Sequence, residues 1–366
     1  MRLYLGIVFV ILIVLALSIT KDAKNENKGK LLKSKDALVN DLLPIRVIFV
    51  IIMGFFWFLT AFRAYNIGND THSYVRVFNN IAKNGIISNL YMEIGFQYFC
   101  LLISKISSNP RVFLFVNATI CYIAVAIYIL KYSKNILFSL VLFFCFFFSD
   151  FTTMLRQNLA MIIVLYAYQA LKNKKNIKFF LMVVFASLFH TTAWFALLLY
   201  FHKWLPNKIW KSILIIVCCV ILSATGLIAP LITKLFSAYE SYFESVFVGT
   251  GWLGVGVNLL RNAMLYLIMH SIYQSNKDEK LPVWSLFLYL ILTSFAFTMN
   301  QFLRSGKYFL MITMVDLPNA LTTRKLKDEN VIILILGIIF CMYFLITLRF
   351  RPEWNSIYPY KFYWNS

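Results

Sequence analysis

A long succession of apolar stretches divides this sequence, each close to the length of a membrane-spanning helix. They cover about 3 to 19, 43 to 62, 112 to 130, 135 to 149, 156 to 171, 178 to 201, 213 to 233, 258 to 273, 283 to 299, 306 to 322 and 331 to 348. The composition is 61% hydrophobic and only 14% charged, with a mean hydropathy of +0.74. Inside lipid a backbone must satisfy its own hydrogen bonds, which a helix does within one segment. We therefore predict an all-α polytopic membrane helical bundle, a single integral membrane domain over 1–366 with about 10 to 12 transmembrane helices and some re-entrant or interfacial segments.

Several classes of site are excluded by the residue types. The cysteines lie within apolar runs without metal-ligand spacing, so neither a disulfide framework nor a zinc site is expected. There is no paired-aspartate motif, phosphate-binding glycine loop or HExxH, and no serine or cysteine has a base nearby in sequence. We expect no cofactor and no metal. The glycine-rich stretch 249–258 is interpreted as a flexible outer loop, and the first apolar run as an uncleaved span because no small-residue cleavage site precedes Lys21.

Lysines orient the predicted bundle. The loop 21–41 is lysine-rich, which indicates a cytoplasmic position and sends the N-terminus and residues 63–97 to the outer face. The net charge of +20 is therefore explained first by the orientation of the chain in the membrane, and it does not indicate a nucleic-acid partner. Later basic clusters stay inside only if 93–106 is a short interfacial or re-entrant helix and 178–201 is a re-entrant hairpin with FASLFHTTAW at its tip. A continuous helix over 178–201 with a satisfied histidine is the alternative.

Arginines have the opposite distribution in this topology. The positive-inside rule treats both residue types alike, so outer arginines need another cause. A guanidinium binds phosphate or carboxylate through two parallel hydrogen bonds, which points to an anionic ligand at the outer face. The outer set is Arg2, Arg63, Arg76, Arg111, Arg156, Arg261, Arg304, Arg349 and Arg351.

The outer-face loop 63–111 concentrates ionisable residues between two apolar blocks. Asp70, His72, Tyr74, Arg76 and Glu93 lie in its first part. Ionisable groups near lipid are costly, so we interpret this segment as half of a functional site. An ordinary solvated loop is the alternative.

Two further clusters follow. In DFTTMLRQNLA, Asp150 lies near Arg156 and Gln157, which offer donors to an anion at a helix start. Alternatively, Arg156 only reaches for lipid headgroups. His190, followed by two threonines, is a candidate base, or a hydrogen-bonded packing residue as most membrane histidines are.

The last cluster is NQFLRSGKYF. Arg304 and Lys307 lie three residues apart on one helical face, where they can bind one anion together. Asn300 and Tyr308 belong to the same cluster, and Asp316 lies within the next span.

These clusters, in this order, resemble the EpsG family of Wzy-like polysaccharide polymerases over nearly the whole chain. The presence of His72 within the first motif departs slightly from a simple pattern. The matching motifs are NDTHSYVRVF at 69–78, MEIGFQ at 92–97, MLRQNLA at 154–160, SLFHTTAWFALLL at 187–199, YESYF at 239–243, the region of Arg304 and Tyr308, and IYPYKF at 357–362.

The resemblance implies a metal-independent glycosyltransferase that joins oligosaccharide repeat units carried on undecaprenyl diphosphate. It would act at the outer leaflet of the bacterial plasma (inner) membrane in capsule, exopolysaccharide or O-antigen synthesis, with both termini outside. Expected partners are the lipid-linked oligosaccharide substrate, membrane lipids, and flippase and chain-length regulator proteins, with no nucleic acid. The alternatives are a transporter or flippase of lipid-linked oligosaccharides, and a ligase or acyltransferase on the same substrates.

Residue roles follow from that chemistry. Cleavage of a glycosyl-diphosphate bond builds negative charge, for which Arg156, Arg304, Arg76 and the neighbouring Gln157 are the candidate ligands. The acceptor hydroxyl needs a base, for which Asp70, Glu93 and His190 compete in that order. A nearby arginine makes a carboxylate a weaker base, which favours Glu93 or His190 and leaves the choice open. Tyr74 and Tyr308 are candidates for stacking on sugar rings.

Overall fold

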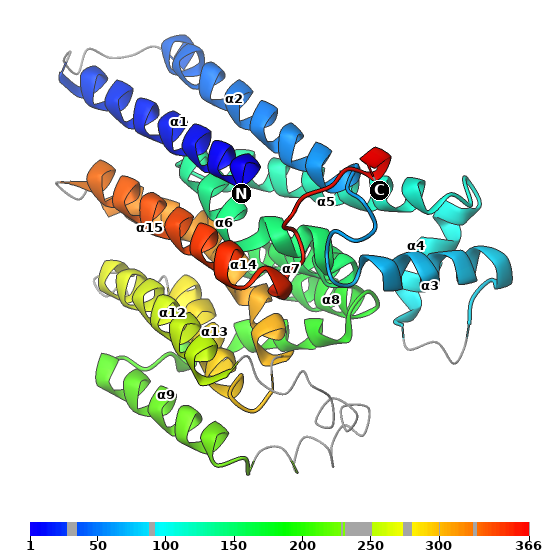
Figure 1. The fold of residues 1–366 in the computed structure, drawn as a ribbon. Coiled ribbons are helices and arrows are strands. Elements are labelled where there is room, and N and C mark those ends of the chain that lie inside the picture. The colour runs from blue at the N-terminus through cyan, green and yellow to red at the C-terminus, as the bar shows by residue number, and fades with distance from the viewer. Residues whose placement is uncertain are drawn as a thin grey trace. The chain divides into compact units, whose positions relative to one another are not determined.

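The chain folds into α-helices in a computed structural model (Figure 1). The structure describes residues 1–27, 35–87, 92–227, 230, 251–273, 280–299, 301–324 and 328–365. Within these ranges the one β contact is an isolated bridge between Arg63 and Phe362, so the predicted all-α class is confirmed there. The chain divides into two compact units, described separately: residues 1–162, 188–190 and 321–366 form the first, and residues 163–187 and 191–320 the second.

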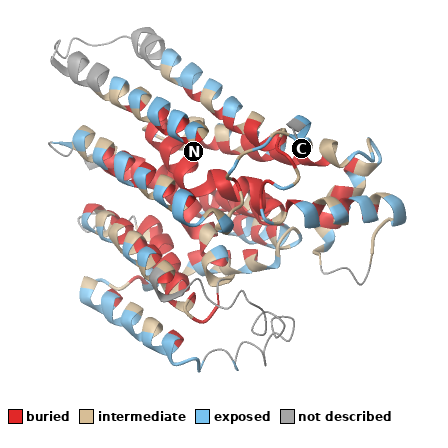
Figure 2. Ribbon diagram, viewed as in Figure 1, coloured by how far each residue is buried: buried red, intermediate tan, exposed pale blue. Residues whose placement is uncertain are grey.

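The first unit is built around one helix, α6, in which every residue is buried. Helices α1, α2, α5 and α15 contact it. Their apolar sides meet it while exposed residues occupy the other sides (Figure 2). The helices of this unit are α1 (Arg2–Asn27), α2 (Lys35–Ala61), α3 (Thr71–Asn84), α4 (Ile94–Ser104), α5 (Pro110–Tyr132), α6 (Ile136–Thr153), the start of α7 (Leu155–Lys172) and α15 (Glu329–Phe350).

Phenylalanines make the core around α6. The ring of Phe144 lies 5.1 Å from Phe56 of α2 and 4.6 Å from Phe344 of α15, and Phe146 lies 5.0 Å from Phe340. Such aromatic pairs each add about 0.5–1.5 kcal/mol beyond the area that they bury. The start of α6 is fixed by Asn135, whose side chain accepts a hydrogen bond from the Phe138 amide at 2.9 Å. The aromatic contacts and the Asn135 cap together fix the position of α6 in this unit.

The second unit has a similar central helix, α13, whose residues are nearly all buried. It contacts α9, α12 and the 3₁₀ helix η1, and the Trp284 indole of α13 donates to the Leu198 carbonyl of η1 at 2.7 Å. The helices here are the rest of α7, α8 (Asn176–Ser187), η1 (Thr191–Trp204), α9 (Ile209–Ala224), α12 (Gly251–Tyr273), α13 (Lys280–Phe295) and α14 (Gln301–Arg324).

Five helices of the described part are long and apolar enough to cross a membrane: Arg2–Ile19, Leu43–Ala61, Pro110–Tyr132, Ile136–Thr153 and Glu329–Phe350. Large apolar side chains such as Phe9 and Ile51 are exposed on these helices, as suits a surface that faces lipid. The chain is therefore a multi-helix membrane protein. A total of about 10 to 12 spans stays a prediction.

The lysine distribution predicts that residues 93–106 and 178–201 do not form simple membrane-spanning helices, and the helix boundaries agree. Residues 93–106 contain the 11-residue helix α4, too short to span. The 178–201 stretch is not a continuous helix, because α8 ends at Ser187 and η1 begins at Thr191. The rings of Phe180 and Tyr200 lie 5.1 Å apart, so α8 and η1 fold back on each other as a hairpin with Leu188–His190 at its tip. Their depth in the membrane stays a prediction.

Two predicted loops contain helices instead. The prediction of a flexible loop over 249–258 is wrong from Gly251 onwards, where helix α12 begins. The outer-face loop 63–111 contains α3 and α4. On α3 one face is buried through Thr71, Tyr74, Phe78 and Ile81, the spacing of an amphipathic helix, which the polar composition had hidden. The YESYF motif lies outside the described residues, as do residues 28–34 of the lysine-rich loop 21–41.

A tail segment, residues 352–364, holds the turn that leads into α3. The amide of Ala64 donates to the Lys361 carbonyl at 2.9 Å, and the amide of Gly68 donates to the Ser356 carbonyl at 3.0 Å. The Asn69 side chain donates to the Trp354 carbonyl at 2.8 Å. The tail therefore completes the hydrogen bonding of a turn that has no regular structure of its own.

Arg63 and Arg111 complete this turn. Arg63 is 0% exposed and donates to the Thr60 carbonyl at 2.5 Å, and burial lowers its pKa to about 10. Arg111 donates to the Arg63 carbonyl at 2.7 Å, and its guanidinium lies over the rings of Tyr65 and Tyr363 at 3.5 and 4.9 Å. Two arginines from the predicted outer set thus make protein contacts.

Candidate active site

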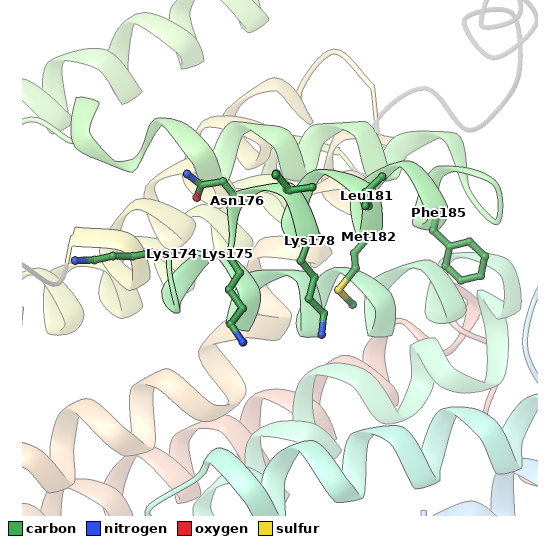
Figure 3. A pocket seen from close by; sticks show the side chains of 8 residues that line it. Lys174, Lys175, Asn176, Lys178, Leu181, Met182 and Phe185 are labelled. Carbon is green, nitrogen blue, oxygen red and sulfur yellow. The ribbon is translucent and has the colours of Figure 1, made fainter.

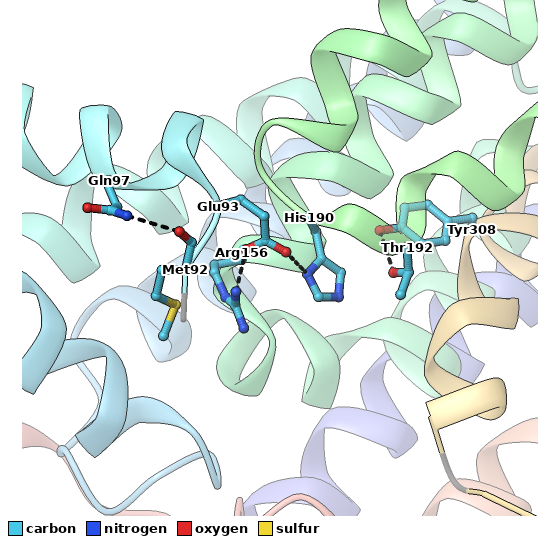
Figure 4. Close-up of polar contacts among 7 residues, drawn as sticks. All are labelled: Met92, Glu93, Gln97, Arg156, His190, Thr192 and Tyr308. Atoms are coloured by element: carbon cyan, nitrogen blue, oxygen red, sulfur yellow. Dashed lines mark hydrogen bonds and ion pairs between the residues drawn. The ribbon is translucent and has the colours of Figure 1, made fainter. Parts of the chain in front are cut away.

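Three ionisable residues predicted from separate parts of the sequence meet in the first unit. The Glu93 carboxylate forms an ion pair through Oε2 with Nη1 of Arg156, and its Oε1 lies 3.0 Å from Nδ1 of His190 (Figure 4). The three side chains are 14%, 19% and 21% exposed, respectively. They are therefore shielded from bulk water yet still open to a ligand. We call Glu93, Arg156 and His190 the triad.

Arg156 takes its position from a break between two helices. Helix α6 ends at Thr153, α7 begins at Leu155, and Met154 between them has φ −101° and ψ 61°, outside helical values. The Asn158 side chain donates to the Asp150 carbonyl at 2.9 Å, across the break. The same carbonyl also accepts from the Met154 amide at 2.8 Å, so Asp150 ties the end of α6 to the start of α7. Arg156 is thus held in the first turn of α7.

Glu93 takes its position at the N-terminus of α4, where its backbone is extended (φ −61°, ψ 143°). The buried Gln97 side chain fixes both flanks of the preceding connection. Its Nε2 donates to the Met92 carbonyl at 3.0 Å, and its Oε1 accepts from the Ile87 amide at 3.0 Å. Gln97 therefore determines where the chain enters α4, and so where the Glu93 carboxylate lies.

Gly95 brings the hairpin tip against this entry. Its amide donates to the Leu188 carbonyl at 2.9 Å, and a Cβ at this position would lie 2.7 Å from the same carbonyl oxygen. Only glycine allows the two backbones to approach so closely. This contact places His190, two residues beyond Leu188, beside Glu93.

We expect Gly95→Ala to separate the tip from α4 and to reduce both thermal stability and activity. Overpacking of this kind costs about 1–3 kcal/mol, and the Glu93 to His190 hydrogen bond would lengthen. The measurements are the melting temperature of the purified protein and the complementation of cells that lack it. Gly54→Ala is the matched control, since a Cβ there meets nothing within 4 Å. Wild-type stability and activity for Gly95→Ala would contradict the assignment.

Tyr74 adds an aromatic wall to the triad. The guanidinium carbon of Arg156 lies 5.9 Å from the centre of the Tyr74 ring, and this ring packs at 5.6 Å against Phe96. The start of α3 is seated on the end of α6, where Thr71 donates to the Thr152 carbonyl at 3.3 Å. Gly68, with φ +85°, passes so close to that carbonyl that a Cβ would lie 2.4 Å from it.

Arg156 and His190 each have a hydrogen-bonding atom that a ligand can use. Arg156 has five N–H donors, and its buried Nε has no hydrogen-bond partner among the described residues. A buried unpaired donor is a position where a ligand or an ion is expected. When His190 donates from Nδ1 to Glu93, the imidazole Nε2 becomes the acceptor. The arrangement can thus hold an anion at one end and accept a proton at the other.

The other candidates of the first unit lie around the triad. Asp70 is at the N-cap position of α3, one turn before Tyr74, and is half-buried. Arg76 is exposed on the face of α3 opposite the buried one. Gln157 is buried directly after Arg156. The structure therefore brings Glu93, Arg156, His190 and Tyr74 together, and it leaves Arg76 on the surface.

Arg304 and Tyr308 belong to the second unit, on α14. Arg304 is exposed, whereas Tyr308 is buried and its hydroxyl lies 3.2 Å from the Thr192 hydroxyl. Asn300 lies outside the described residues. Asp316 is buried and is bonded by Tyr168 and, at 3.5 Å, by Lys172, which gives it a structural role within this unit.

Gly95 and Gln97 have positioning roles that sequence reasoning did not assign. Both lie in the MEIGFQ motif, so the motif itself was the available signal. Their partners, Leu188, Ile87 and Met92, are backbone groups, and a backbone partner leaves no trace in residue type. Among the described residues, no group of three His, Cys, Asp or Glu has the geometry to hold a metal ion.

Together, the helical fold and the shielded acid, arginine and histidine define a multi-helix membrane protein with a polar site beside its apolar core. A model of the EpsG family matches residues 46–362. The chain belongs to the EpsG family, whose members are Wzy-like polysaccharide polymerase-type membrane proteins. The match includes Glu93, Arg156, His190 and the tail to Phe362. No curated protein and no solved structure matches the chain.

Proposed function

We propose that this protein polymerises oligosaccharide repeat units carried on undecaprenyl diphosphate, at the outer leaflet of a bacterial plasma membrane. Family membership indicates a polysaccharide polymerase-type function. The observation that carries the proposal is Glu93, whose two oxygens engage an arginine and a histidine at once. Glycosyl transfer from a diphosphate needs a cation for the leaving group and a base for the acceptor, and the triad contains both.

His190 is the proposed base. Its Nε2 would take the proton of the acceptor hydroxyl as the hydroxyl oxygen attacks the anomeric carbon of the donor sugar. Glu93 would hold the imidazole in the tautomer with hydrogen on Nδ1 and would stabilise the imidazolium that forms, as a carboxylate does in a catalytic triad. The bond between the anomeric carbon and the diphosphate oxygen breaks, and its electron pair goes to the diphosphate.

Arg156 is the proposed partner of that leaving diphosphate. Its Nε has no hydrogen-bond partner among the described residues and is available while Nη1 stays on Glu93. In a shielded site such donors stabilise developing charge more than in water. Gln157, Arg304 and Arg76 remain proposed diphosphate ligands, and Tyr74 and Tyr308 proposed sugar contacts. Asp70 remains the alternative base. No metal or nucleotide is required by this scheme.

A transporter of the same substrates is the competing function, and cells lacking the protein distinguish the two. Loss of a polymerase should leave single repeat units on the lipid carrier at the outer face, with no long chains. Loss of a flippase should leave them at the inner face. Accessibility of the accumulated repeat units to an impermeant sugar-modifying reagent reports the difference. Repeat units protected from the reagent in otherwise intact cells would overturn the polymerase proposal.

A further inference from the structure

A cluster of lysines lies at the start of α8. Lys174, Lys175 and Lys178 are exposed, and none forms an ion pair with an acidic residue of the described part of the chain. The neighbouring Lys172 differs, because it lies 3.5 Å from Asp316. Three uncompensated positive charges within five residues repel one another and favour an anionic partner.

The same segment lines an open cavity of about 780 Å³. Its charged end is formed by these lysines, and its other end by Leu181, Met182 and Phe185. Figure 3 shows the side chains of Lys175, Lys178, Met182 and Phe185 on one side of the segment. Their spacing of three, four and three residues repeats along one helical face. Charge and apolar surface therefore follow each other along the axis of α8.

This gradient matches an amphiphile with an anionic head and an acyl chain. A helix of 12 residues is about 18 Å long, roughly the depth of one lipid leaflet including part of the headgroup region. Leu181 and Phe185 are 65% and 51% exposed, so an acyl chain has apolar surface to cover. Asn176 is the one uncharged polar residue in the lining. Sugars require many more hydrogen-bonding groups, so a glycolipid fits this cavity poorly.

We propose that the Lys174–Phe185 segment binds an anionic phospholipid, with its phosphate at Lys175 and Lys178 and an acyl chain along Met182 and Phe185. Basic pockets beside membrane helices recognise such headgroups by charge. A zwitterionic phospholipid carries its own cation next to the phosphate and gains less from the lysines. This site is separate from the triad and does not depend on the proposed reaction.

The test is native mass spectrometry of the full chain released from phosphatidylcholine nanodiscs that contain some phosphatidylglycerol. The wild-type protein should retain phosphatidylglycerol in preference to phosphatidylcholine. At about 1 kcal/mol per basic residue near a membrane surface, the double variant Lys175→Gln/Lys178→Gln should lose roughly thirtyfold in affinity. The control Lys203→Gln/Lys208→Gln makes the same charge change at two exposed lysines of the same unit and should retain the lipid.

A competition arm separates a lipid from a free phosphate group. Added phosphatidylglycerol of a different acyl-chain mass should displace the bound phosphatidylglycerol. Glycerol phosphate, which lacks acyl chains, should not. Equal retention by the two double variants would overturn the proposal. Displacement by glycerol phosphate at the same concentration would also overturn it, by showing a phosphate site with no acyl contribution.

Discussion

Replacing Arg156 with lysine is expected to lower the rate of polymer elongation by roughly a hundredfold or more, the usual cost of losing one donor aimed at developing charge. Lysine keeps the positive charge but cannot bind Glu93 and a diphosphate through the separate N–H groups of one planar fork. The rate is measured on purified protein in liposomes that contain lipid-linked repeat units.

Arg349→Lys is the matched control, because it makes the same substitution at an exposed arginine of α15. It should elongate at the wild-type rate. Both variants should remain folded, which the melting temperature checks. An Arg156→Lys protein that makes long chains at the wild-type rate would exclude Arg156 from the transition state.

The second large effect is expected at Glu93 and His190. Glu93→Gln keeps the shape of the side chain but removes its charge, so His190 loses its stabilising carboxylate and the shielded Arg156 loses its counter-ion. His190→Ala removes the proposed base. General base catalysis contributes typically 10²–10⁴-fold, so each variant should lose about that much in rate. Glu93→Gln should also lower the melting temperature, since it leaves a charge uncompensated.

The double variant decides whether the two residues act together. Residues that act as one unit are strongly non-additive, so Glu93→Gln/His190→Ala should be no slower than the slower single variant. Asp70→Asn should lose less than about tenfold, the scale of a residue outside proton transfer. Multiplicative losses in the double variant would show independent roles. If Asp70→Asn lowered the elongation rate as much as His190→Ala does, Asp70 would be the better candidate for the base.

The sequence was sufficient to find the members of the triad but not to join them. Glu93, Arg156 and His190 stood out because ionisable groups are costly near lipid. They lie far apart in the chain, and the contact between Gly95 and the Leu188 carbonyl that unites two of them involves backbone atoms only. Asp70 lies near Arg63 and Arg76 in sequence, but Arg63 is buried against a carbonyl and Arg76 is exposed on α3. The order of Asp70 and Glu93 as candidate bases stays a prediction.

The arginines show a second limit of sequence reasoning. Their outward bias was attributed as a group to an anionic ligand. In the structure Arg156 joins the triad, whereas Arg63 and Arg111 bind backbone carbonyls and aromatic rings around the tail. A buried arginine with carbonyl partners and a ligand-binding arginine look alike in sequence. The role of the terminal IYPYKF motif was invisible for the same reason, because its Lys361 acts through a carbonyl oxygen.

The helical fold was more predictable, since hydropathy and length largely determine it. The break at His190 followed from placing lysines on one side, and the hairpin of α8 and η1 agrees with it. The start of α12 was missed because Gly251, Gly254 and Gly256 suggested a loop. A glycine inside a helix costs only about 1 kcal/mol relative to alanine, so glycines alone do not exclude a helix.

The most direct measurement is elongation by the purified wild-type protein in liposomes supplied only with lipid-linked repeat units. The proposal predicts a ladder of products spaced by one repeat unit, with one lipid diphosphate released for each linkage formed, and with neither nucleotide nor added metal. The Glu93→Gln protein in the same liposomes should leave the repeat units single. A wild-type protein that moves the repeat units across the bilayer but never lengthens them would contradict the proposal.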